Sequence, residues 1–195
     1  MPRNLTWIVA VLVSTIAAAG ANAQSTSEMI AQAVLPLPED LRVDATVFTY
    51  DADTGERIVL RQGTNQVECR PRNPETGYTR CFPVVDAARR DLAAKLAAEG
   101  RSEDEVDVEM SAAITAGTVA PRPFGSLSYR LYEEDDRIQL LWMVAVPNAV
   151  SEYLGMPTGS QRDSSLAGRG TPWMMLEGTP GAHLMIPING TELSN

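Results

Sequence analysis

Short apolar stretches alternate with charged turns along most of this chain. Residues 45–50 (ATVFTY) and 57–61 (RIVLR) are rich in β-branched and aromatic residues, and the Gly-containing turn between them is typical of a β-hairpin. From Asp51 this turn also follows the D-x-D-x-G beginning of a calcium loop, but the twelfth position of that loop is Gln62, where a calcium loop needs a glutamate. The pattern therefore favours a simple hairpin turn.

From Asp86 onward the apolar residues recur at helical spacing. Leu92 and Leu96 lie one turn apart among alanines, and Gly100 follows as a helix end. Ser102 then begins an S-x-x-E capping box, which starts a second helix that ends before Gly117. Both helices have narrow apolar stripes, so we predict an αα-hairpin that packs on a sheet.

Two further strands follow the predicted helices. Residues 127–132 alternate in strand fashion, and an acidic turn leads to residues 138–146 (IQLLWMVAV), the most apolar run outside the N-terminus. Such a run fits a central strand buried on both faces, with Trp142 in the core. Together the order predicts an α+β fold: an antiparallel sheet of about five strands, an αα-hairpin packed on it, and a long Gly/Pro-rich C-terminal loop region over residues 155–190.

The N-terminus has the three parts of a secretory signal peptide. A basic residue, Arg3, precedes an apolar run over residues 7–19, and Ala21-Asn22-Ala23 is a small-x-small cleavage site. The apolar run is shorter than the roughly 20 residues of a membrane span. We therefore predict a signal peptide over residues 1–23, cleaved near Ala23, and a secreted or periplasmic protein without a membrane span in its mature chain.

The predicted mature chain has two parts. Residues 24–43 are a lead-in segment whose end is expected to dock through Val34, Leu35 and Leu37, and residues 44–195 form a single α+β domain. The length of this second part is enough for one hydrophobic core.

The two cysteines, Cys69 and Cys81, are even in number and close in sequence. In an oxidising compartment this indicates a disulfide, and closing so short a loop stabilises the fold by about 3 kcal/mol. Between and beside them lie Arg70, Arg72 and Arg80, the most basic local patch of the chain. We expect a stapled surface loop, which is either simply solvated or a docking surface for an acidic partner or an anionic glycan.

The charge balance excludes several classes of partner. The chain has 16 Lys and Arg against 25 Asp and Glu, a formal net charge of −9, which disfavours nucleic acid and anionic membranes. Its only lysine, Lys95, lies in a predicted helix, so phosphate-loop and Schiff-base mechanisms have little support. We expect no cofactor.

We place the candidate site in residues 155–190, because Gly- and Pro-rich loops on a scaffold commonly carry function. Arg162 and Arg169 could clamp a carboxylate or sulfate through paired hydrogen bonds, Trp173 could stack on a ring, and His183 is the only histidine. We therefore favour a non-catalytic binding or interaction module, whose partner is an unknown small molecule or protein.

Two alternatives use the same stretch. A serine-type hydrolase could draw on Ser164 or Ser165 with His183 and Asp163, although the G-x-S-x-G elbow is absent. The chain has too few histidines for the usual zinc sites.

Copper(I) is the metal that the composition of this stretch favours most. Thioether sulfurs bind copper(I), so His183 with Met185 and Met175 could form a site. With Trp173 nearby, this set of residue types is similar to the ligands of periplasmic copper-resistance chaperones, which implies copper(I) binding outside the cytoplasm. Separately, Asn189 begins a glycosylation sequon that matters only in a host that modifies it.

Overall fold

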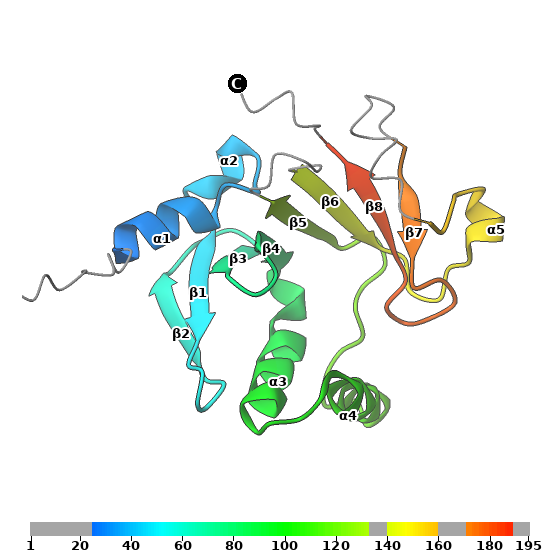
Figure 1. The fold of residues 1–195 in the computed structure, drawn as a ribbon, viewed down its shortest axis with the longest axis horizontal. Helices are drawn as coiled ribbons and strands as arrows, with labels where there is room; N and C mark the ends of the chain where they lie inside the picture. The colour runs from blue at the N-terminus through cyan, green and yellow to red at the C-terminus, as the bar shows by residue number, and fades with distance from the viewer. Residues whose placement is uncertain (1–24, 133–139, 160–170, 189–195) are drawn as a thin grey trace, which may run out of the picture.

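The protein folds around one mixed sheet of eight strands, seen in a computed structural model that describes residues 25–132, 140–159 and 171–188 (Figure 1). The strand order is β2-β1-β3-β4-β5-β6-β8-β7. The strands are β1 (Thr46–Tyr50), β2 (Arg57–Arg61), β3 (Val67–Asn73), β4 (Tyr78–Pro83), β5 (Leu127–Tyr132), β6 (Leu140–Ala145), β7 (Trp173–Met175) and β8 (His183–Pro187).

The α+β class is confirmed, but the expected antiparallel sheet of about five strands is wrong. The sheet is larger, and β1 pairs with β3 in parallel, with Val47 opposite Cys69. The segment expected to be a surface loop instead forms β3 and β4, next to each other in the middle of the sheet. The prolines in this segment led us to expect a loop there. The pairing of β3 with β4 is irregular between Arg70 and Asn73, around Pro71. Proline is tolerated in a strand at such irregularities.

The C-terminal part of the sheet also differs from the expectation. Residues 140–145 form β6, which is not central, because β8 and β7 continue the sheet beyond it. Both of these strands come from the stretch that was expected to be loops. Just before this stretch, α5 (Ser151–Leu154) is a single helical turn, and residues 160–170 lie outside the described part.

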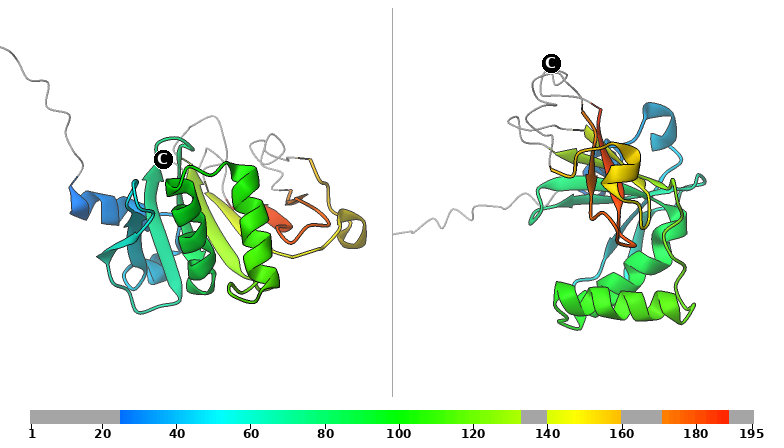
Figure 2. Two further views of the ribbon diagram at one scale, coloured as in Figure 1. Left: turned by 90° about the horizontal axis from the view of Figure 1, so that it is seen from below. Right: turned by 90° about the vertical axis from the view of Figure 1, so that its right-hand side faces the viewer.

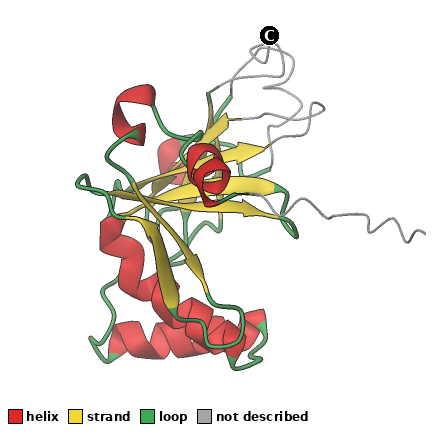
Figure 3. Ribbon diagram, turned by 90° about the vertical axis from the view of Figure 1, so that its left-hand side faces the viewer, coloured by secondary structure: helices red, strands yellow, loops and turns green. Residues whose placement is uncertain are grey.

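Helices cover the two faces of the sheet. On one face lie α1 (Thr26–Ala33) and α2 (Glu39–Arg42). On the other lie α3 (Ala87–Ala98), which follows a 3-10 turn, Val84–Asp86, and α4 (Glu103–Thr115) (Figures 2 and 3). The two predicted helices are therefore present and Ser102 caps the second, but they do not form the expected hairpin. In Figure 1, α4 is seen end-on while α3 runs down the page.

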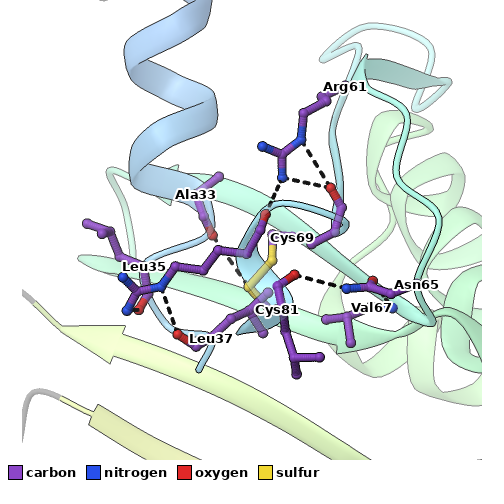
Figure 4. Close-up of a disulfide and its surroundings, with 11 residues drawn as sticks. Ala33, Leu35, Leu37, Arg61, Asn65, Val67, Cys69 and Cys81 are labelled. Atoms are coloured by element: carbon purple, nitrogen blue, oxygen red, sulfur yellow. Dashed lines mark hydrogen bonds between the residues drawn. A yellow bond between two sulfur atoms is a disulfide. The ribbon is translucent and has the colours of Figure 1, made fainter. Parts of the chain in front are cut away.

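The N-terminal segment contributes to the hydrophobic core behind the sheet. Ala33, Val34 and Leu37 are buried beside the Cys69–Cys81 disulfide, and the Cys81 sulfur lies 3.4 Å from the Ala33 carbonyl oxygen (Figure 4). The predicted disulfide is thus confirmed. The expected docking of Leu35 is wrong, because this side chain is 43% exposed.

Arginine side chains tie this segment to the sheet. Arg42 donates to the carbonyl oxygens of Leu37 and Leu35, and Arg61 donates to those of Arg42 and Ala45 (Figure 4). Hydrogen bonds of this kind satisfy carbonyl groups that no strand partner reaches.

The calcium-like sequence is a hairpin turn. The Asp51 carboxylate accepts hydrogen bonds from the backbone N–H groups of Asp53 and Thr54, as in an Asx-turn. Gly55 has a φ of 69°, and a Cβ there would lie 2.6 Å from the Ala94 carbonyl oxygen on α3. Glycine therefore serves both the turn and its close approach to the helix.

A buried ion-pair network fastens α3 to the sheet. The Glu68 carboxylate, 5% exposed, accepts from Arg57 at 2.9 Å and also from Arg90 of α3. Arg57 donates in addition to Asp91 of α3 at 2.6 Å. Asp91 also accepts from the Tyr50 hydroxyl at 2.7 Å. Burial and this hydrogen bond raise the pKa of Tyr50 to about 12.

Among the residues that the structure describes, no helix combines the length and the apolar character needed to cross a bilayer. The predicted signal peptide lies outside the described part of the chain.

We predict that Glu68→Gln lowers the free energy of unfolding by about 3 kcal/mol, because it leaves two arginines without their shared buried counter-charge. Urea unfolding monitored by circular dichroism measures this. Glu109→Gln, an exposed position on α4, is the matched control and is expected to change stability by less than about 0.5 kcal/mol. Equal effects of the two changes would contradict the central role of Glu68.

Candidate functional site

Three arginines lie side by side across the middle of the sheet. Arg70 on β3 is paired in register with Arg80 on β4, and Arg80 with Arg130 on β5. Successive residues of a strand point to opposite faces. Cys69 and Cys81 belong to the core behind the sheet, so the neighbouring Arg70 and Arg80 point to the face that α3 and α4 cover. Like charges directly opposite each other on adjacent strands destabilise a sheet.

No carboxylate neutralises Arg70 or Arg80 among the described residues. Instead, the Arg80 guanidinium lies 4.8 Å from the centre of the Phe82 ring and 3.9 Å from the Met143 sulfur, and its buried Nε has no hydrogen-bond partner there. Burial, followed by repulsion from Arg130, lowers the pKa of Arg80 to about 10. Burial lowers the pKa of Arg70 as well. Both remain cationic at neutral pH.

A cavity of about 400 Å³ opens between these strands and the helices α3 and α4. We call it the arginine cavity. Its lining contains five arginines and only two aspartates, Asp86 and Asp107, in a protein whose net charge is −9. The five arginines are Arg70, Arg80, Arg89, Arg90 and Arg122.

Two of these five arginines have acidic partners. Arg122 Nε lies 3.2 Å from the buried Asp86 carboxylate, and Arg90 shares Glu68 with Arg57. Even so, Nε and Nη1 of Arg90 are buried without a hydrogen-bond partner among the described residues. Burial is also the main cause that lowers the pKa of Arg90 to about 10. Buried guanidinium nitrogens of Arg80 and Arg90 beside the cavity thus have no hydrogen-bond partner among the described residues.

Aromatic rings hold these guanidinium groups in place. Phe82 lies beneath Arg80 and also beneath Arg90, at 4.3 Å from the latter, and Tyr50 lies 4.9 Å from Arg70. Cation–π contacts orient a guanidinium while leaving its N–H edge free. Arginine side chains ordered in this way are suited to bind carboxylate, sulfate or phosphate oxygens through paired hydrogen bonds.

Of the residues predicted as binding or catalytic from the sequence, the structure describes only some. Arg162, Asp163, Ser164, Ser165 and Arg169 lie outside the described residues, so their roles stay predictions, and so does any modification of Asn189. Trp173 is 4% exposed and packs with Met143 and Met185, which makes it a core residue of the sheet.

His183 and the two methionines lie on the sheet face that carries Arg80. Met185 is paired with Trp173 and Met143, and His183 with Met175 and Ala145. The His183 Nδ1 lies 2.8 Å from the Gly181 carbonyl oxygen. Because a carbonyl only accepts, Nδ1 carries the proton, and Nε2 is the nitrogen left for other contacts.

The copper(I) hypothesis also stays a prediction. Burial is the main cause that lowers the pKa of His183, and the positive charges of Arg122, Arg80 and Arg130 lower it further. A cation would meet the same repulsion. Among the described residues, no group of three or more His, Cys, Asp or Glu side chains could hold a metal ion together.

No family model, curated protein or solved structure matches this chain. The site therefore has to be interpreted from its own geometry.

Two of the arginines that line the cavity, Arg70 and Arg80, could be recognised in the sequence as part of a basic patch. The patch of Arg70, Arg72 and Arg80 pointed to an anionic partner, although as an exposed loop. Arg89 and Arg122 could not be added to it, because they come from a helix and from the segment before β5 and meet the sheet only in the fold.

We predict that Arg80→Met raises the free energy of unfolding by about 1 to 2 kcal/mol, because an unpaired buried cation is replaced by an apolar side chain next to Phe82 and Met143. Thermal and urea unfolding of the protein without added anions test this. The control is Arg61→Met, which removes hydrogen bonds to the Ala45 and Arg42 carbonyls and should destabilise. If both variants lose stability alike, Arg80 is a structural residue.

We further predict a pH-dependent contribution of His183. Its pKa in the folded protein is below the usual value of 6.5, so the unfolded chain binds a proton at a higher pH than the folded one. Stability from this residue is therefore present above about pH 6.5 and decreases as the pH falls below it. Urea unfolding between pH 5 and 8 should show this decrease in the original protein and a smaller one in His183→Gln. Parallel curves would refute it.

Proposed function

We propose that this protein is a non-catalytic binding protein that acts outside the cytoplasm, and that its ligand is an organic anion held in the arginine cavity. One observation carries the proposal: Arg70 and Arg80 lie in register on adjacent strands, face a cavity, and have no carboxylate partner among the described residues. Such an arrangement costs folding free energy, and a bound anion offsets that cost.

The confinement of the charges favours a small ligand over a polymer. A nucleic acid or an anionic membrane needs an extended basic surface, whereas here the cations line a cavity of about 400 Å³ in an acidic protein. This volume is within the usual range of small-molecule sites. The described lining of this cavity consists of guanidinium groups, two aspartates, Tyr50 and apolar side chains, without a serine, cysteine, histidine or lysine. This composition supports binding over nucleophilic catalysis.

The earlier hypotheses about residues 155–190 are compatible with this proposal. Arg162 and Arg169 stay predicted ligand contacts in loops of their own, and export to an oxidising compartment agrees with the Cys69–Cys81 disulfide. No described contact favours the serine-type hydrolase.

The test is a binding screen with purified, unreduced protein. We expect small carboxylates, sulfate and phosphate esters to raise the melting temperature in a saturable way, because a ligand at 100 times its dissociation constant adds about 2.7 kcal/mol of stability. Uncharged amides or methyl esters of the same acids should have no effect. Isothermal titration calorimetry then gives the affinities.

Matched variants separate specific binding from general salt effects. Arg80→Gln should weaken anion binding at least about tenfold. Arg101→Gln removes an equal charge from an exposed position on the loop between α3 and α4, near Glu105, and should leave binding unchanged. A screen without any saturable anion, or equal binding by both variants, would refute the proposal.

A further inference from the structure

A second cavity adjoins the arginine cavity at Arg70, which lines both. This second cavity, which we call the side cavity, has a volume of about 540 Å³ and lies between the β1–β2 turn, the β3–β4 turn and the end of α3. Four residues line both cavities: Tyr50, Arg70, Ala94 and Ala97. A small third cavity beneath Arg70 and Arg80 adjoins both. The two larger spaces therefore lie next to each other, with Arg70 and Tyr50 lining both, and we call them together the trough.

The two halves of the trough differ in charge. The arginine cavity has five arginines against two aspartates. The side cavity has Arg70 and Arg72 against Asp51 and Glu75, so its charges balance. Its other polar side chains are neutral, those of Thr49, Tyr50 and Asn73. One half thus suits a group with several negative charges, and the other suits an uncharged group that forms hydrogen bonds.

Alanines on α3 provide the space along the whole trough. Ala93 lines the arginine cavity, Ala98 lines the side cavity, and Ala94 and Ala97 line both. A longer side chain at these positions would fill the space between the helix and the strands. These alanines of α3 therefore leave open space opposite Arg70 on β3, while Arg89 and Arg90 of the same helix line the arginine cavity.

We propose that the ligand has two unlike parts: an oxyanion group with two or more negative charges in the arginine cavity, and an uncharged, hydroxyl-rich extension that passes Arg70 into the side cavity. A carbohydrate that bears a phosphate or several carboxylates has this chemistry. The inference rests on the proposed function, since it takes the arginine cavity to be the anion site, and it adds the charge and the length of the ligand.

The experiment compares probes of increasing length by calorimetry on the purified, unreduced protein. Inorganic phosphate represents the charged group alone, glucose 6-phosphate adds one ring, and trehalose 6-phosphate adds a second. We expect affinity to rise at least about tenfold from phosphate to trehalose 6-phosphate, as hydroxyl groups form hydrogen bonds in the trough. Trehalose alone should not bind measurably. Acetate, with a single charge, should bind at least about tenfold more weakly than phosphate.

Two variants locate the two parts separately. Ala98→Phe fills the side cavity and should remove the gain from the second ring while leaving phosphate binding unchanged, and Arg80→Gln should weaken all charged probes. Ala88→Phe is the control, because Ala88 is exposed on α3 and lines neither cavity.

The outcomes distinguish this inference from the proposed function. If phosphate binds but the sugar phosphates gain nothing, or if Ala98→Phe and Ala88→Phe behave alike, the two-part ligand is refuted while the anion site stands. If acetate binds as tightly as phosphate, the multiply charged group is refuted. If none of the charged probes binds, the anion site itself falls. Citrate in place of phosphate tells a polycarboxylate from a phosphate ester, and tighter binding of either supports the multiply charged group.

Discussion

The buried carboxylate of Glu68 holds the two layers of this protein together. It lies between Arg57 of β2 and Arg90 of α3, and all three side chains are at least four-fifths buried. A single unpaired charge at this depth would cost several kcal/mol, so the three groups have to remain together. The pairing fixes α3 over β3 and β4, and that placement creates the trough between the helix and the strands. The candidate site therefore depends on an ion-pair network of which Arg90 lines the arginine cavity, whereas Glu68 and Arg57 do not.

The same part of the sheet combines satisfied and unsatisfied charge. The carboxylates of Glu68 and Asp91 form ion pairs with Arg57, and Glu68 also pairs with Arg90. The Asp86 carboxylate forms an ion pair with Arg122. Of the arginines that line the cavity, Arg70, Arg80 and Arg89 have no ion pair among the described residues, and aromatic rings contact the first two. Natural proteins commonly depart from the most stable arrangement where a site has to bind something, and the surplus of cations here has that character.

Much of the local structure could be predicted from the sequence, because it depends on neighbouring residues. The β1–β2 hairpin, the Ser102 cap and the Cys69–Cys81 pairing each follow from residues a few positions apart. The parallel pairing of Val47 with Cys69 does not, because contacts far apart in sequence leave no periodic signal. The R-P-R-N-P run was interpreted as a loop on composition, although the core on one side and the arginine row on the other make it a central strand. The trough could not be predicted from the sequence either, because its arginines come from strands, a helix and a connecting segment that are far apart in the chain.

The disulfide has a consequence for the opposite face of the sheet. Cys69 lies directly opposite Cys81, and Arg70 lies directly opposite Arg80. Cys69 precedes Arg70 and Cys81 follows Arg80, so the disulfide lies on the sheet face behind the Arg70–Arg80 pair. Sliding β3 by one residue against β4 would turn one of these arginines toward α1 and the core. Repulsion between the two guanidinium groups favours such a slip. The covalent bond forbids it, and so acts as a register lock: a crosslink between two apolar side chains keeps two like charges face to face.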